Sequence, residues 1–296
     1  MRLFRNKLFF FFSLLVYTLL LTGGLLYFRF PAETFRLYCQ TQIDALLPNA
    51  SCSIQKLQYR FPLALQVDEL RFSSTLQKGQ ELATVDQTII RPDLSSPTSR
   101  FQVTLKACEG SHAFTLVVDP DTQQFALEDI QLTDLNLAEF PFLQQTLGRD
   151  VTGSLSGTGS YQGGWQQDGA PGKGQGNLVV SEGSFSLLLP IFSLNSIDLK
   201  KMSSELVLEN NRLRLAKGNF QGKELMGAFS GDIALKHPLT QAPLTFKGTL
   251  EPLPPLLKTS KYARDMIRQL KKHKAQATLP FVLSGKVGSP KFKIDS

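Results

Sequence analysis

The sequence predicts a mainly β protein, in which an N-terminal transmembrane helix is followed by a long, curled antiparallel β-sheet in meander order with a few capping helices. Three observations predict this class. Residues 8–28 form an uncharged run rich in Phe and Leu. Hydrophobic residues then alternate with polar ones through most of the chain, as they do in strands that bury one face. Two stretches with helical spacing, residues 31–47 and 258–276, flank the alternating region.

The uncharged run Leu8–Phe28 is long enough to cross a hydrocarbon core of about 30 Å. Arg2, Arg5 and Lys7 precede it, so the positive-inside rule assigns residues 1–7 to the cytoplasm and the main body to the periplasm. A cleaved signal peptide is the alternative, but the run is longer than a usual signal core and no A-x-A site follows it. We therefore expect a single-pass protein of a bacterial inner membrane.

The charge of the chain is concentrated at its two ends. The chain has 32 Lys and Arg and 25 Asp and Glu, which gives a net charge of +7. Residues 1–30 carry +4 and residues 256–296 carry +8, which leaves −5 on the body between them. A mildly acidic body argues against nucleic acid as a partner.

The two flanking stretches predict helices with different surfaces. Residues 31–47 have apolar residues at helical spacing and end before Pro48, which favours a helix that caps the sheet over one that meets a membrane or a partner. Residues 258–276 form a basic amphipathic helix, which either caps the sheet with a solvated face or lies on an anionic membrane. The residues of that candidate membrane surface are Lys261, Arg264, Arg268, Lys271 and Lys272.

The clearest hairpin covers residues 205–215. Asn210 and Asn211 suit a two-residue turn, because Asn tolerates positive φ. The resulting register places four leucines on one face, and the next strand continues that face with Phe229 and Ile233. If the sheet curls, this face becomes an apolar groove for lipid, with candidate residues Leu206, Leu208, Leu213, Leu215, Phe229 and Ile233.

Residues 148–177 hold ten of the 22 glycines, which predicts a connector. It would join an N-terminal β half, residues 29–147 with their leading helix, to a C-terminal β half, residues 178–296. The glycines do not form a phosphate-binding loop, because G-x-x-x-x-G-K-[ST] is absent from the sequence.

The sequence does not predict an enzyme, a cofactor or a metal site. The chain has three histidines, and none stands in a metal-binding or nucleophile motif. Cys39, Cys52 and Cys108 are too few for a disulfide framework. A Cys39–Cys52 disulfide and buried free thiols both remain open interpretations.

The layout and closing strands carry a family resemblance. A basic tail, one anchor and a β-rich body ending in LPFVLSGKVGSPKF (residues 279–292) resemble the type II secretion system protein N family, in its longer, deltaproteobacterial-type branch. The strand pattern, as in LVLENNRLRL (residues 206–215), is also AsmA-like. The resemblance implies an accessory component of the secretion machinery that acts through protein–protein contacts, and it implies no catalytic residues. The alternative is an AsmA-like protein that binds or transfers lipid in the cell envelope.

Overall fold

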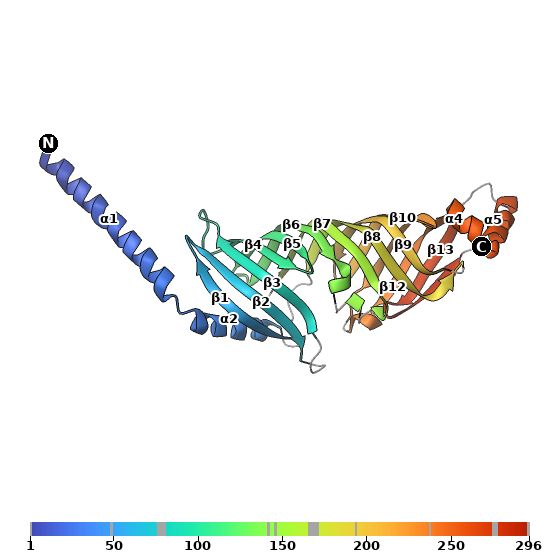
Figure 1. Cartoon of the computed structure of the whole chain (residues 1–296), viewed down its shortest axis with the longest axis horizontal. Coiled ribbons are helices and arrows are strands. Elements are labelled where there is room, and N and C mark those ends of the chain that lie inside the picture. The colour runs from blue at the N-terminus through green and yellow to red at the C-terminus, as the bar shows by residue number, and fades with distance from the viewer. Residues whose placement is uncertain are drawn as a thin grey trace.

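A computed structural model describes residues 2–47, 50–75, 81–140, 143–144, 147–164, 172–192, 194–236, 238–273 and 278–294. Their dominant feature is one antiparallel sheet of 14 strands in which every strand pairs with its neighbours in sequence. The meander predicted from the alternating pattern is therefore confirmed (Figure 1). Its strands are β1 (Ala50–Arg60), β2 (Ala64–Ser74), β3 (Glu81–Pro92), β4 (Arg100–Ala107), β5 (Gly110–Asp119), β6 (Gln124–Asn136), β7 (Val151–Gly164), β8 (Lys173–Ile191), β9 (Leu194–Glu209), β10 (Arg212–Gly222), β11 (Leu225–Ala234), β12 (Pro243–Pro252), β13 (Leu279–Lys286) and β14 (Ser289–Ile294).

Helix α1 (Arg2–Arg29) extends away from the sheet (Figure 1). Its placed side chains are largely exposed and apolar, with exposed fractions of 75% for Phe9, 66% for Phe12 and 53% for Leu25. Among the described residues, no helix combines the length and the hydropathy required to cross a membrane.

Helix α2 (Ala32–Leu46) packs on the first two strands, as expected for a capping helix. Phe35 and Ile43 of α2 pack against a buried cluster of the sheet that comprises Cys52, Ile54, Leu57 and Val67. The helix also occupies the outer edge of β1: Asp44 Oδ1 accepts a hydrogen bond of 2.5 Å from Cys52 N–H, and Arg36 Nη1 donates one of 3.0 Å to Ile54 O. These contacts bind backbone groups that an edge strand otherwise leaves unpaired.

The opposite end of the sheet is capped by two short helices, α4 (Pro254–Thr259) and α5 (Lys261–His273). The sequence predicted one helix from Lys258, but the helices separate at Ser260. Its side chain accepts a hydrogen bond of 3.2 Å from Ala263 N–H, a capping contact that starts a new helix. Residues 274–277, which include the predicted end of the helix, lie outside the described residues.

The glycine-rich stretch 148–177 holds β7 and the start of β8, and the sheet continues through it without a break. We expected a connector between two halves, and residues 165–171 of it lie outside the described residues. Within the strands, Gly157 and Gly159 of β7 and Gly174 and Gly176 of β8 lie at alternate positions, on the same face as Leu155 and Tyr161. Pairs such as Gly159–Gly176 bring two backbones together, and a Cβ on Gly159 would lie 2.6 Å from Gln175 O.

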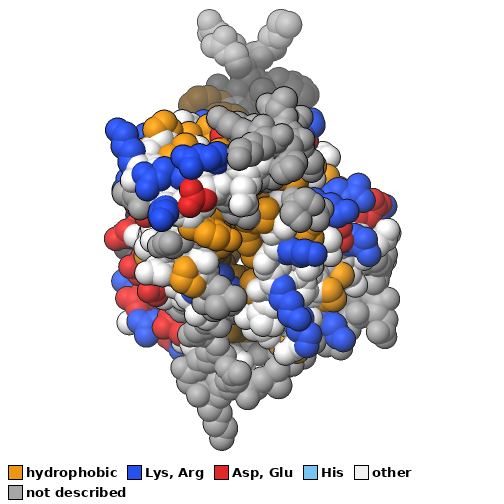
Figure 2. All heavy atoms as spheres, turned by 90° about the vertical axis from the view of Figure 1, so that its right-hand side faces the viewer, with side chains coloured by type: hydrophobic (Ala, Val, Ile, Leu, Met, Phe, Trp, Pro, Cys, Tyr) orange, Lys and Arg blue, Asp and Glu red, His pale blue; other side chains and the backbone are white. Residues whose placement is uncertain are grey.

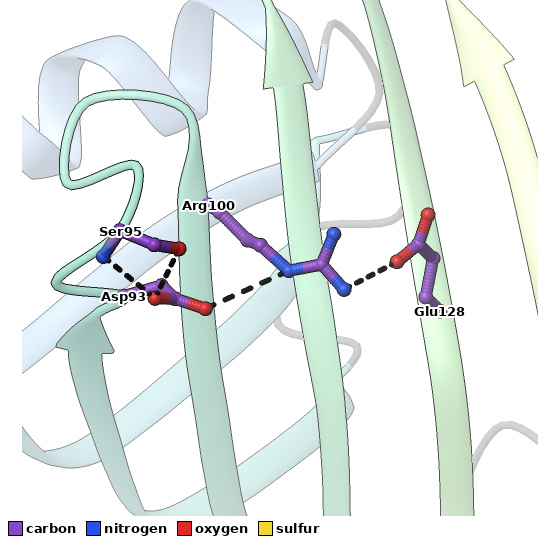
Figure 3. Close-up of polar contacts among 4 residues, drawn as sticks. All are labelled: Asp93, Ser95, Arg100 and Glu128. Atoms are coloured by element: carbon purple, nitrogen blue, oxygen red, sulfur yellow. Dashed lines mark hydrogen bonds and ion pairs between the residues drawn. The ribbon is translucent and has the colours of Figure 1, made fainter.

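The outer face of the sheet carries charged networks (Figure 3). Arg100 on β4 lies between Asp93, after β3, and Glu128 on β6, with N–O distances of 3.8 and 2.7 Å. Ser95 donates two hydrogen bonds to Asp93 Oδ1 from its backbone N–H and its hydroxyl. The Ser95 hydrogen bonds, with a smaller effect of Arg100, hold the pKa of Asp93 below its usual range. Exposed ion pairs of this kind contribute little to the stability of a fold, and their charged groups keep this face solvated.

Candidate ligand-binding groove

The other face of the sheet, which we call the inner face, is largely apolar from end to end. Cross-strand pairs link it continuously, first from β1 to β6 and then, after a bulge, from β6 to β13. The first row comprises Leu57, Val67, Thr88, Leu105, His112 and Leu132. The second comprises Leu135, Leu155, Val180, Met202, Phe220, Gly227, Leu250 and Leu279.

The hairpin register predicted for residues 205–215 is confirmed. Leu208 pairs with Leu213 and Leu206 pairs with Leu215. Asn210 and Asn211 have φ of 52° and 57°, as a two-residue turn between right-twisted strands requires.

The six candidate groove residues lie on the inner face, but they do not form one pocket. Ile233 lines an apolar cavity, and Phe229 packs on the buried cluster beside it. Leu206 and Leu208 line two shallower hollows over β6–β9. Leu213 and Leu215 are half-buried between these regions. The centre of the apolar surface is thus displaced toward the C-terminal strands.

The cavity lies inside the curled C-terminal part of the sheet and has a volume of about 490 Å³. Phe185 on β8 and Phe292 on β14 line the same space, although these strands are far apart in the sheet order. The sheet therefore curls until its eighth and last strands face each other. Viewed from the C-terminal end, hydrophobic side chains line the hollow and charged side chains surround it (Figure 2).

Leu147 and Arg149, which precede β7, line one side of the cavity. Leu147 packs both against the cluster of Leu137, Val151 and Val180 and against the cluster of Ala242, Leu244 and Val287. These clusters belong to opposite sides of the curled sheet. Leu147 therefore links the two sides across the opening.

Arg149 is the one charged residue among the described residues that line this cavity. Its Nε donates a hydrogen bond of 3.1 Å to Leu147 O, and its Cζ lies 4.9 Å from the centroid of the Phe185 ring. Burial lowers the pKa of the guanidinium from its ordinary value, and the side chain is half-buried. No carboxylate forms an ion pair with it within the described part of the chain. As far as the structure describes its lining, the cavity is thus an apolar space with one cation that has no carboxylate partner.

Phenylalanine side chains cover glycines on neighbouring strands around this cavity. The cross-strand pairs are Phe220–Gly227, Phe229–Gly218, Phe246–Gly231 and Phe281–Gly248. A ring lying over a paired glycine fills the space that the missing side chain leaves. Of these rings, Phe220 and Phe281 line the cavity itself.

His112 lies on the inner face, between Leu105 and Leu132. Its Nε2 is buried and has no hydrogen-bond partner among the residues that the structure describes. Burial lowers the pKa of the imidazole, and the Ala107 backbone hydrogen bond opposes this only in part. No group of metal-ligating side chains comes together within the described residues.

The basic helix positions Ala263 and Ile267 against the sheet and leaves Lys261, Arg264 and Arg268 exposed. The side chains of Lys271 and Lys272 are outside the described part. Cys39, Cys52 and Cys108 are free thiols in this structure.

Comparison with protein-family models, with curated proteins and with solved structures found no match. The site must therefore be interpreted from its own geometry. Sequence reasoning missed Arg149, since one charge before a strand is typical of a solvated loop. Arg149 is distinguished by its place beside Phe185 and by its lack of a carboxylate partner among the described residues. Both features depend on the curl of the sheet, so they are visible only in the tertiary structure.

Proposed function

We propose that this protein is an inner-membrane-anchored, periplasmic accessory component of the type II secretion machinery that acts through protein–protein contacts. The observation that carries the proposal is a sheet with one apolar face, in which β14 pairs with no further strand among the described residues. The family resemblance of the sequence, described above, supports the same assignment.

The exposed apolar surface of α1 supports anchoring. Large side chains such as Phe9 and Phe12 project from a helix that leaves the sheet, and water solvates such a surface poorly. The proposed topology, with residues 1–7 in the cytoplasm and the sheet in the periplasm, comes from the charge pattern of the sequence. Carbonate extraction of membranes tests the anchor: we expect the full chain to stay in the pellet and to be digested by protease added to spheroplasts. Release by carbonate, or protection from protease, contradicts this topology.

The edge strand β14 supports partner binding. No strand pairs with its far side among the described residues, whereas α2 occupies the edge of β1. An unpaired edge accepts a further strand from another protein. Lys291 and Lys293 on β14 are exposed, which favours an acidic partner segment.

Charge reversal at this edge tests the proposal. We expect Lys291→Glu combined with Lys293→Glu to abolish co-purification with secretion subunits from mildly solubilised membranes, and to reduce exoprotein secretion. The matched control is Lys201→Glu combined with Lys247→Glu. It makes the same charge change at exposed positions of β9 and β12, which are paired on both sides. Full secretion in a strain that lacks the protein overturns the assignment.

A second candidate function, lipid binding or transfer in the cell envelope, is favoured by the continuous apolar inner face. Burying an acyl chain against it yields about 25 cal/mol per Å² of apolar surface. Native mass spectrometry of the full chain released from nanodiscs tests this function. Lipid retained in stoichiometric amounts supports it, and a chain free of lipid contradicts it.

A further inference from the structure

We propose that the C-terminal cavity binds one long-chain fatty acid, with its alkyl chain inside the cavity and its carboxylate at Arg149. This inference deepens the lipid-binding candidate function and rests on it. It assigns a defined site and a single-chain anionic ligand, which neither candidate function specifies.

The cavity has the size and the lining of a site for one apolar chain. Its volume of about 490 Å³ lies within the range of about 300–1,000 Å³ that is usual for small-molecule sites. Its described lining is apolar except for Arg149. Small-molecule sites commonly combine an apolar lining with one or two polar groups that fix the orientation of the ligand.

Charge complementarity determines the headgroup. A half-buried guanidinium without a carboxylate partner is costly to hold in apolar surroundings, and an anion that reaches it relieves this cost. Its Nε is already bound to Leu147 O, which leaves the terminal nitrogens to donate to a carboxylate. The Phe185 ring beside the guanidinium restrains its orientation.

Photo-crosslinking of the full chain in phosphatidylcholine nanodiscs tests the site. The probes are a diazirine-bearing hexadecanoic acid and the matching hexadecanol, which has the same chain without the charge. We expect the acid to label peptides that contain Phe185 and Phe292, as found by mass spectrometry. We expect Arg149→Met to reduce labelling by the acid about tenfold or more, since a charge-assisted hydrogen bond is lost, and to leave labelling by the alcohol within about twofold.

Matched variants separate the site from the fold. Arg214→Met removes an exposed cation on β10 and is expected to change labelling by neither probe. Ile233→Trp fills the cavity and is expected to reduce labelling by both probes. Ile130→Trp lies on the inner face outside the cavity and is expected to reduce labelling by neither probe. Circular dichroism melts exclude variants that do not fold.

Each outcome bears on the inference. Equal labelling of the inner face by acid and alcohol, unaffected by Arg149→Met, overturns it and leaves the lipid-binding function standing. Labelling confined to α1 contradicts both the fatty-acid site and the lipid-binding function. The inference assigns a ligand with a single chain. It is therefore also overturned if native mass spectrometry finds a diacyl phospholipid as the one bound species.

Discussion

The guanidinium carbon of Arg149 lies 4.9 Å from the centroid of the Phe185 ring, and both residues line the apolar cavity. A cation within about 6 Å of a ring centroid is attracted by the ring, more strongly where water is excluded. The contact joins the segment before β7 to β8, at a place where the curled sheet faces its own last strand.

This contact is expected to contribute a measurable coupling energy. Arg149→Met and Phe185→Leu, made singly and together, should give a coupling of about 0.5–2 kcal/mol in the free energy of unfolding. Urea denaturation of the four proteins measures it. The more exposed Arg212–Asp232 pair serves as the comparison, with an expected coupling of about 0–1 kcal/mol. Additive effects at Arg149 and Phe185 contradict the prediction.

His112 should make the protein less stable in acid. Burial holds its folded-state pKa below the ordinary value of 6.5, so the unfolded chain binds the proton more tightly. Its contribution is therefore present at neutral pH and is lost as the pH falls below about 6.5. His112→Phe should flatten the dependence of the melting temperature on pH between about pH 7 and pH 5. An unchanged slope in the variant assigns the dependence to other groups.

Cys52 should be a nearly inert thiol. It is 2% exposed, and burial, with smaller effects of Asp44 and Cys39, raises its pKa to about 11. In a Cys39→Ser, Cys108→Ser variant, maleimide at mildly alkaline pH should modify Cys52 about 100-fold more slowly in the folded protein than in urea. A Cys39→Ser, Cys52→Ser variant isolates Cys108, which is half-buried and should react faster. Equal folded-state rates for the two thiols contradict the assigned burial.

Gly248→Ala should destabilise the C-terminal sheet. A Cβ at this position would overlap Ala228 O and lie 2.7 Å from the Phe281 ring. Overpacking of this kind costs about 1–3 kcal/mol. Gly164→Ala is the control, because the nearest atom to its Cβ is Gln123 O at 3.7 Å, and we expect a change within about 0.5 kcal/mol. Thermal melts of both variants measure the difference. Equal losses of stability in the two variants contradict the explanation by overpacking.

Asp44→Ala should weaken the protection of the β1 edge. The change leaves Cys52 N–H without its partner on α2, at an expected cost of about 1–3 kcal/mol in the free energy of unfolding. Because an unpaired edge recruits other strands, self-association should also increase. Glu33→Ala removes an exposed partner of Arg36 and should change neither property appreciably. Urea denaturation and light scattering of both variants provide the measurements.

Particular residues show how much of the fold could be predicted from the sequence. The pairs Leu208–Leu213 and Leu206–Leu215 were predictable, because a two-residue Asn turn and an alternating pattern determine a register locally. Helix α2 was predictable from its apolar spacing. Residues 148–177, which hold β7 and the start of β8, were interpreted as a connector, because a strand pattern is hard to recognise when Gly replaces the apolar residue. The break at Ser260 depends on one side-chain capping contact.

By itself, the sequence determined the alternating strand pattern and, for the hairpin of residues 205–215, the register and the face that the leucines occupy. These properties depend on neighbours within one hairpin. The tertiary structure alone decided where the inner face becomes a cavity. Arg149 and Phe185 line the same cavity as Phe292 only because twist and curl accumulate over β8 to β14. That accumulated geometry is set by many strand contacts together, so no local pattern marks Arg149 as part of a site.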